Sequence, residues 1–156
     1  MLNPNNLETI KQVTKEFFRK TTFDVEIQFL PQQDLIIPIN LKSDEPKVLI
    51  GEGGQTLIEI QRLLKSMLRR QIDQEFYIDL DINGYKKKKI EYLKELAKSI
   101  ANEVALMKEE KTLPSMPAYE RRIIHLELST REDISTDSIG KEPERKIVIK
   151  PHSQQL

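Results

Sequence analysis

The sequence predicts an α+β protein built from two small modules, on three observations. Three segments alternate between apolar and polar residues, which is the pattern of half-buried strands. Longer segments carry apolar residues at helical spacing. Two short motifs, a glycine-rich turn at 51–54 and an Arg-x-x-x-His pair at 121–125, lie in separate halves of the chain. A chain of 156 residues is long enough for two small domains.

The first module is expected to run helix, strand, strand, helix, glycine turn, helix, strand. Its predicted elements are a helix at 7–20, strands at 23–29 and 35–41, a short helix ending at 50, a helix from 55 and a strand at 76–82. Asn5 or Asn6 is the expected N-cap of the first helix, and Ser43 or Asp44 that of the short one. Pro38 lacks a backbone donor, so the second strand is expected to be exposed on that side.

The second module is expected to begin with one long amphipathic helix. Its predicted elements are a helix at 85–107, a polar loop at 108–117, a helix ending near 129, and strands near 133–138 and at 145–149. Pro117 lies in the first turn of the later helix, where its missing N–H is tolerated. We therefore expect domains at 1–84 and 85–152, followed by a tail at 153–156.

Composition excludes several classes of protein. The chain has no Cys, which excludes disulfides, thiolate metal sites and thiol nucleophiles. It has no apolar run of about 20 residues, the length of a membrane span, and its first residues do not resemble a signal peptide. These features predict a soluble cytoplasmic protein.

An enzyme is not expected either. The glycine turn lacks the Gly-Lys-Ser/Thr ending of a phosphate-binding loop, and no His or Cys spacing forms a metal site. Asp79 and Asp81 share the strand face opposite the apolar one, so they are expected to face solvent. We therefore expect no catalytic residue, no metal and no cofactor.

Basic side chains are clustered, although the charges of the whole chain balance. Lys plus Arg and Asp plus Glu both total 25, so only local clusters can bind phosphate. One such cluster is formed by Arg62, Lys65, Arg69 and Arg70, with no acid from 61 to 72, and another by Lys86 to Lys89. The alternative is that both clusters are ordinary solvated helix faces.

The glycine turn has the chemistry of a phosphate contact. Glycines let a backbone approach a ligand closely because they carry no Cβ, and the following helix points its free N–H groups at the turn. The alternative is a helix C-cap followed by a tight turn. The candidate binding residues here are Gly51, Glu52, Gly53, Gly54 and Gln55.

Residues 7–82, with their order of elements and their glycine turn between two helices, resemble a type II KH domain. That resemblance implies a three-stranded sheet packed by helices, and a groove that grips single-stranded nucleic acid beside the turn. KH turns often carry Lys or Arg where this chain has Glu52 and Gly53. A carboxylate repels phosphate and competes for the helix N-terminus. We therefore expect weak binding at the turn, or binding displaced towards Lys65 and Arg69.

Arg121 and His125 lie four residues apart and are therefore neighbours on one helix face. An Arg fork suits phosphate, and a His adds a donor or a stacking ring. An isolated Arg-x-x-x-His is more simply structural. The surrounding stretch from Met116 to His125, however, resembles the R-three-H module. That resemblance implies binding of single-stranded nucleic acid by Arg121, Arg122 and His125.

A type II KH domain followed by an R-three-H module is the arrangement of the bacterial Jag, or SpoIIIJ-associated, family. The matching residues include 49–51, 54–57, 84–85 and 119–126. The resemblance implies a cytoplasmic regulator that binds single-stranded RNA, or DNA, and that pairs with a small single-KH protein or with itself. The N-terminal Jag domain of that family is expected to be missing, since the sequence starts near the first KH helix.

The alternative function is a protein-interaction scaffold. In that case the acidic turn marks a KH domain that has lost nucleic-acid binding and that dimerises or binds a partner protein. Salt separates the two functions, because single-strand binding weakens by about 0.7 log units per log unit of salt for each phosphate neutralised. A scaffold shows no such binding.

Overall fold

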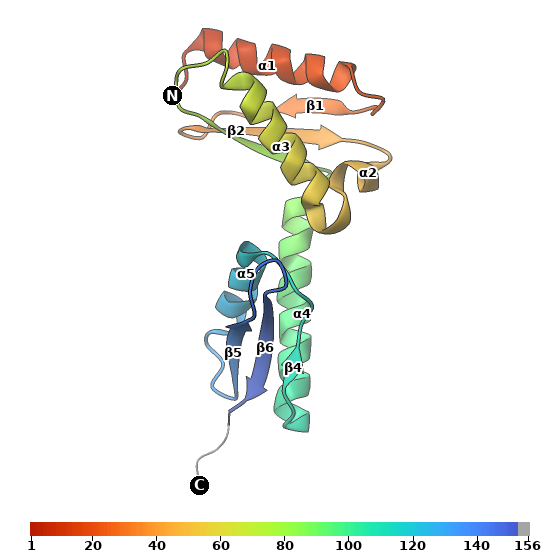
Figure 1. Cartoon of the computed structure of the whole chain (residues 1–156), viewed down its shortest axis with the longest axis vertical. Helices are drawn as coiled ribbons and strands as arrows, with labels where there is room; N and C mark the ends of the chain where they lie inside the picture. The colour runs from red at the N-terminus through yellow and green to blue at the C-terminus, as the bar shows by residue number, and fades with distance from the viewer. Residues whose placement is uncertain (153–156) are drawn as a thin grey trace. The chain divides into compact units, whose positions relative to one another are not determined.

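Helices and small sheets occur together in both halves of the chain, as Figure 1 shows. The computed structural model describes residues 1–152, so the predicted tail at 153–156 lies outside the described residues. The chain divides into two compact units; the first covers Met1–Lys86 and the second begins at Lys87. Within the described part, each unit contains a three-stranded sheet, which confirms the predicted α+β class.

The first unit has the predicted order of elements. These are α1 (Pro4–Arg19), β1 (Glu26–Phe29), β2 (Ile36–Lys42), α2 (Pro46–Ile50), the short 3-10 turn η1 (Glu52–Gly54), α3 (Gln55–Leu68) and β3 (Tyr77–Ile82). In the sheet, β2 is central, with β1 antiparallel and β3 parallel to it. α1 and α3 cover one face of this sheet (Figure 1). The fully buried side chains of that layer include Ile10, Ile39, Leu64 and Leu80.

α1 begins earlier than its predicted cap. The side chain of Asn3 accepts a 2.8 Å hydrogen bond from the backbone N–H of Asn6 and caps the helix. Pro4 follows at the first helical position, where its fixed φ suits the helix. The prediction of Asn5 or Asn6 as the N-cap was therefore wrong.

α2 also begins without the predicted cap. Pro46 occupies its first turn, and no side chain in the described part of the chain caps it. Ser43 Oγ instead accepts a 3.2 Å hydrogen bond from the backbone N–H of Glu45. The prediction of Ser43 or Asp44 as the N-cap was wrong, because Ser43 shapes the loop before the helix.

Pro38 is buried in the central strand, so the prediction of an exposed side at this position was wrong. Its carbonyl accepts a 3.1 Å hydrogen bond from the backbone N–H of Leu30, the residue directly after β1. β1 ends at Phe29, which pairs with Ile39. The backbone N–H that Pro38 lacks could therefore add only one further hydrogen bond, beyond the end of the β1–β2 ladder. A proline at this point of a central strand therefore removes little pairing.

The second unit packs helices against an antiparallel sheet. Its elements are α4 (Tyr85–Met107), β4 (Lys111–Thr112), α5 (Ala118–Leu128), β5 (Ile134–Ile139) and β6 (Lys146–Pro151). The sheet order is β4-β6-β5. The fully buried core includes Ala97 and Ala101 of α4, Ile124 of α5, and Ile147 and Ile149 of β6. The bounds of α4 agree with the helix predicted at 85–107. Pro117 is the N-cap residue of α5 and precedes its first turn, so its predicted place inside that turn was wrong.

The segment predicted as a loop at 108–117 contains the short strand β4. Lys111 and Thr112 pair with Ile149 and Val148 of β6. The backbone N–H of Leu113 continues this contact with a 2.9 Å hydrogen bond to the carbonyl of Ile147. A two-residue strand carries too little alternation to be seen in the sequence.

Candidate nucleic-acid interface

The glycine turn depends on glycine most strongly at its first position. Gly51 has φ 72° and ψ −177°, a region that is essentially restricted to glycine. A Cβ at this position would overlap the side chain of Thr56. At Gly54 a Cβ would lie 3.0 Å from the ring of Tyr85, whereas at Gly53 it would meet open space. The turn is therefore tightly packed at both ends and open at its tip.

The tip of the turn presents an acid to solvent. Glu52 and Gly53 are exposed. α3 begins at Gln55, and no side chain of the described residues caps its first turn. The backbone N–H of Gln55 already donates to the carbonyl of Glu52, so the positive end of the helix dipole, and not a free Gln55 N–H, is what this turn offers an anion. Gln55 is partly engaged, because its side-chain amide donates a 2.9 Å hydrogen bond to Glu59.

Arg62 and Lys65 of α3, and Arg69 directly after it, lie along one face of the helix, but two of these three cations have partners. Arg62 forms a 3.1 Å ion pair with Glu59, between side chains that are both at least half exposed. The ammonium of Lys65 lies 4.3 Å from the ring centroid of Tyr77, a cation–π contact. Arg69 is exposed, with no ion pair inside the described part of the chain. Two of the three cations thus already interact with other side chains, and among the described residues only Arg69 of the three is left with neither an ion pair nor a ring contact.

The edge of β3 beside α3 is closed by side chains. The Gln61 side chain accepts a 2.9 Å hydrogen bond from the backbone N–H of Leu80. Asp81 accepts hydrogen bonds from the N–H groups of Ile82 and Lys86, and so caps the start of α4. Asp79 forms an ion pair with the Lys86 ammonium. Asp79 is exposed and Asp81 is half-buried on the face opposite the apolar one, as predicted, and both also organise this edge.

The Lys86 to Lys89 run is also largely engaged. Besides the Lys86 pair, Lys87 lies 4.0 Å from Glu91. Lys89 lies 3.6 Å from Glu120, a buried carboxylate on α5. Lys87 and Lys88 are exposed, so this run is mainly a charge-paired, solvated helix face, which is the alternative that the sequence left open for it.

Arg121 is buried, and its fork is occupied by protein atoms. Only 6% of the residue is exposed. One terminal nitrogen donates a 2.6 Å hydrogen bond to the carbonyl of Met116, and the other forms a 2.7 Å ion pair with Glu142 in the β5–β6 turn. Arg121 therefore ties α5 to two loops, which differs from the exposed phosphate fork expected at this position.

His125 is half-buried and is anchored on β5. Its Nδ1 and the hydroxyl of Thr136 are 2.6 Å apart and hydrogen-bonded. Because Nδ1 is occupied, Nε2 is the ring nitrogen that remains for a ligand. Arg122 is exposed, with no ion pair within the described residues. α5 thus presents His125 and Arg122 three residues apart, on neighbouring positions of its surface.

Two residues that the sequence did not single out lie beside this surface. Arg145 is exposed, and its Nε donates a 3.0 Å hydrogen bond to the hydroxyl of Ser138 on β5. Ser138 follows Thr136 by two positions, so both point to the same face of the strand. The alternation of β5 could have indicated this face, but the partner of Ser138 lies across a turn that sequence patterns do not resolve.

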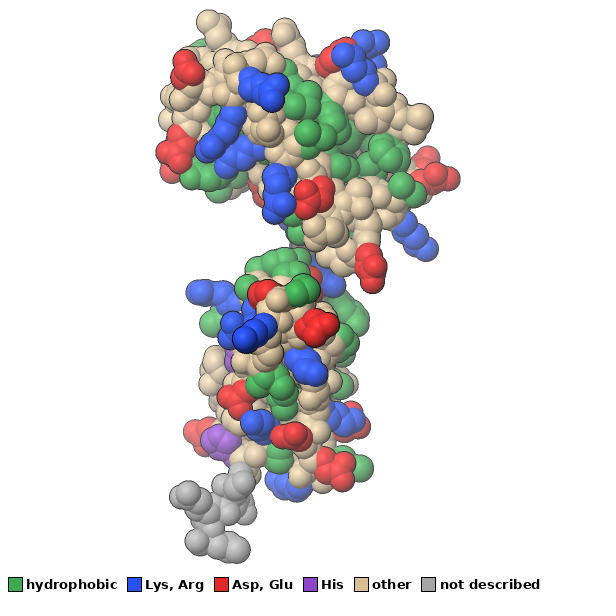
Figure 2. Space-filling view, in the orientation of Figure 1, with side chains coloured by type: hydrophobic (Ala, Val, Ile, Leu, Met, Phe, Trp, Pro, Cys, Tyr) green, Lys and Arg blue, Asp and Glu red, His purple; other side chains and the backbone are tan. Residues whose placement is uncertain are grey.

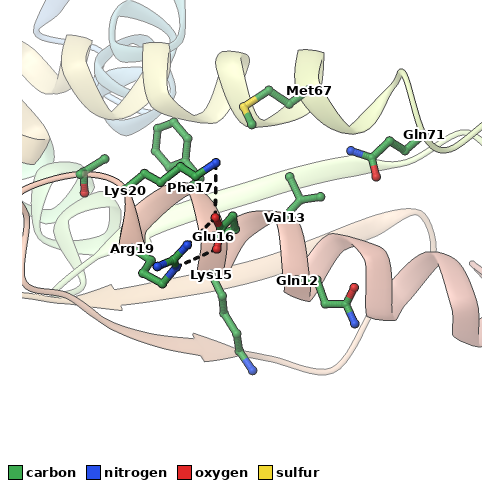
Figure 3. Close-up of a pocket in the computed structure, with 10 residues that line it drawn as sticks. Gln12, Val13, Lys15, Glu16, Phe17, Arg19, Lys20, Met67 and Gln71 are labelled. Atoms are coloured by element: carbon green, nitrogen blue, oxygen red, sulfur yellow. Dashed lines mark hydrogen bonds and ion pairs between the residues drawn. The ribbon is translucent and has the colours of Figure 1, made fainter.

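A separate groove of about 730 Å³ lies between α1 and α3 (Figure 3). Val13 and Phe17 of α1 and Met67 of α3 contribute apolar lining. Glu16 lies between Arg19 at 2.7 Å and Lys20 at 3.3 Å, and its hydrogen bond with Arg19 lowers its pKa to about 2. The groove contains no predicted binding residue and lies near the end of α3 opposite to the glycine turn.

Charge on the surface is mixed. Figure 2 shows Lys and Arg side chains interspersed with Asp and Glu side chains on the face drawn. Within residues 1–152, no helix combines the length and the apolar character needed to cross a membrane. No cluster of three or more metal-ligating side chains occurs in that same range. On the face that Figure 2 shows, any anion site is local rather than part of a broad basic field.

Known proteins resemble this chain over most of its length. Residues 91–151 match the R-three-H domain family. The RNA-binding protein KhpB of Clostridium symbiosum is 32% identical over 148 residues, which are 91% of this chain and 66% of that protein. KhpB of Bacillus subtilis is 32% identical over 81% of this chain and 60% of its own length. KhpB of Lactiplantibacillus plantarum is 29% identical over 82% of this chain and 39% of its own length. The chain thus spans less than two thirds of the length of these relatives, which are named as binding proteins and not as enzymes.

Proposed function

Because this chain belongs to the Jag family and carries an R-three-H domain at residues 91–151, we propose that it binds single-stranded RNA through its second unit. The observation that carries the proposal is the exposed surface where α5 meets β5. There His125 is held by Thr136 with Nε2 left for a ligand, and Arg122 lies beside it. A ring nitrogen and a guanidinium suit a phosphodiester.

Tyr119 extends this surface towards the start of α5. It lies three residues before Arg122, so the two share a helix face, and its side chain is well exposed. Aromatic rings stack on the bases of single strands with little dependence on sequence. Arg122 and His125 then contact backbone, and Tyr119 contacts a base. Duplexes, whose bases are already stacked, fit this arrangement less well.

Arg121 is buried and stabilises the two loops beside this surface. Its bonds to Met116 and Glu142 hold the loop before α5 and the β5–β6 turn. Loss of Arg121 therefore affects binding through the placement of its neighbours. We assign Arg121 as a positioning residue.

The first unit contributes a weaker contact in this proposal. Gly51, Glu52, Gly53, Gly54 and Gln55 form the KH-like turn at the start of α3. The positive end of the helix dipole there can attract a phosphate, but the carboxylate of Glu52 opposes one. Lys65 and Arg69, further along α3, then carry more of the backbone contact than the turn itself.

The second candidate function is a protein-interaction scaffold, with a small single-KH protein or a second copy of this chain as the partner. The exposed carboxylate of Glu52 favours it, as do the partners already held by Arg62 and Lys65. On this alternative the first unit binds protein and no RNA. The α1–α3 groove is then the first surface to examine (Figure 3).

Fluorescence anisotropy of labelled single-stranded RNA across a salt series tests the proposal. We expect binding whose affinity falls with salt, and which the double variant Arg122→Ala/His125→Ala reduces strongly. Lys11→Ala, which removes an exposed charge on α1, is the matched control and should bind as the wild type does. Absence of binding by the wild-type chain at low salt would overturn the proposal in favour of the scaffold.

A further inference from the structure

We propose that Arg145, and not Arg121, supplies a second guanidinium that contacts the nucleic-acid backbone besides that of Arg122, in a phosphate site shared with His125. This inference rests on the proposed function of the second unit. It assigns the phosphate contact to a residue outside the Arg-x-x-x-His motif, and it gives the motif arginine a different role.

The first argument is the placement of the two side chains along β5. Thr136 holds Nδ1 of His125, and Ser138 holds Nε of Arg145. Thr136 and Ser138 are two positions apart on one strand face, which places the two anchors roughly 7 Å from each other. One edge strand therefore brings His125 and Arg145 to the same side, within reach of one phosphate or of two successive ones.

The second argument is the availability of the Arg145 fork. The bond to Ser138 uses Nε and orients the guanidinium. Among the described residues, its two terminal nitrogens have no ion pair or hydrogen bond, and the side chain is exposed. These are the nitrogens with which Arg forms bidentate contacts to phosphate. Arg145 is therefore both oriented and open.

The third argument is what Arg121 does instead. Its ion pair neutralises Glu142, one of the two carboxylates of the turn that precedes Arg145. The backbone of Arg145 is held from the same side, because its carbonyl accepts a 3.1 Å hydrogen bond from the backbone N–H of Met116. Arg121 binds the carbonyl of that same Met116. The buried arginine thus removes a repulsive charge and fixes the turn that presents Arg145.

The local charge agrees with this assignment. Lys141, Arg145 and Lys146 lie within one short segment, together with Glu142 and Glu144. With Glu142 paired to Arg121, the segment offers a net positive charge to a ligand. Contacts of this type position a backbone and carry no base information, so RNA and DNA oligomers should be affected alike.

The test compares two charge-neutralising variants of the full chain by anisotropy, with thermal unfolding as a check on folding. Arg145→Gln should weaken binding of a labelled uridine oligomer roughly tenfold at low salt and reduce the salt slope by about 0.7. Lys108→Gln, an exposed cation in the same unit, is the control and should change neither value. Ser138→Ala should give a smaller loss, because the charge stays while its orientation is lost.

Arg121→Met completes the comparison. This substitution should lower the unfolding temperature. At temperatures at which the variant is folded, its salt slope should equal that of the wild type. If Arg145→Gln binds as the wild type does and folded Arg121→Met has the reduced slope, the assignment is wrong although the chain still binds RNA. If the wild type does not bind, the proposed function fails and this inference fails with it.

Discussion

Arg121 and Glu142 form a 2.7 Å ion pair that joins helix α5 to the turn between β5 and β6. The arginine side chain is 7% exposed and the glutamate side chain 56%. The pair therefore has a buried end and a solvated end. The buried end also donates to the carbonyl of Met116, so that a single side chain holds three segments of the second unit together.

Arg121→Met should destabilise the second unit by about 2 kcal/mol, because it removes a charged hydrogen bond and leaves the Met116 carbonyl without its donor. Urea unfolding measures this change. Arg122→Met, one position along on the exposed face, should change the free energy of unfolding by less than about 0.5 kcal/mol. Equal stability of the two variants would show that the Arg121 contacts do not support the fold.

Gly51→Ala should destabilise the first unit by about 3 kcal/mol, since Gly51 has a backbone conformation restricted to glycine and borders Thr56 closely. Gly53→Ala should cost only about 1 kcal/mol, because it adds a methyl group to open space at a left-handed position. Unfolding monitored by circular dichroism compares the two variants. A reversed order would contradict the geometry described for the turn.

His125→Asn and His125→Gln separate the two ring nitrogens. The Asn amide can occupy the place of Nδ1 and keep the bond to Thr136, whereas the Gln amide reaches towards the place of Nε2. We expect His125→Asn to retain stability and lose RNA affinity, and His125→Gln to retain more affinity. Anisotropy and thermal unfolding on the same samples test this. Loss of affinity only in the Gln variant would mean that the Thr136 contact, and not Nε2, matters for binding.

Glu52→Lys should raise RNA affinity and steepen the salt dependence by about 0.7 if the glycine turn faces a phosphate. The physical reason is the replacement of a repulsive charge by an attractive one at the start of α3, which no side chain of the described residues caps. Glu8→Lys makes the same change in net charge on the exposed face of α1 and is the control. Identical affinities for both variants would mean that RNA bypasses the turn.

The second unit should lose stability in acid, because the stabilising contribution of the Glu127 carboxylate is lost there. Hydrogen bonding to Lys98, together with the charge of Lys94, lowers the pKa of Glu127 in the folded state. A lowered folded pKa adds stability above the unfolded value of about 4.3. That stability disappears as the pH falls through the folded pKa. Glu127→Gln should therefore reduce the difference in melting temperature between pH 7 and pH 3, and Glu95→Gln, on the exposed face of α4, should not.

The sequence was sufficient where a feature repeats locally. The alternation of β2 and β3 and the helical stripe of α4 predicted these elements to within a residue or two. Both patterns arise because one face of each element is buried. The order of elements and the fold class followed from them.

The sequence was insufficient where the decisive partner is distant along the chain. Pro38 is tolerated in a central strand only because β1 ends opposite to it. The charge of Arg121 is paired by Glu142, 21 residues later in the chain. Arg145 gains its orientation from Ser138 across a turn. Periodicity reports burial of a face, and it carries no information on which side chain closes a particular contact.

Amide chemical-shift mapping tests the central claim most directly. Unlabelled single-stranded RNA would be titrated into the ¹⁵N-labelled chain. Binding through the second unit predicts the largest shifts in α5 around Arg122 and His125 and in the β5–β6 turn around Arg145, with smaller shifts at the glycine turn. Shifts confined to the α1–α3 groove, or no shifts at all, would contradict it.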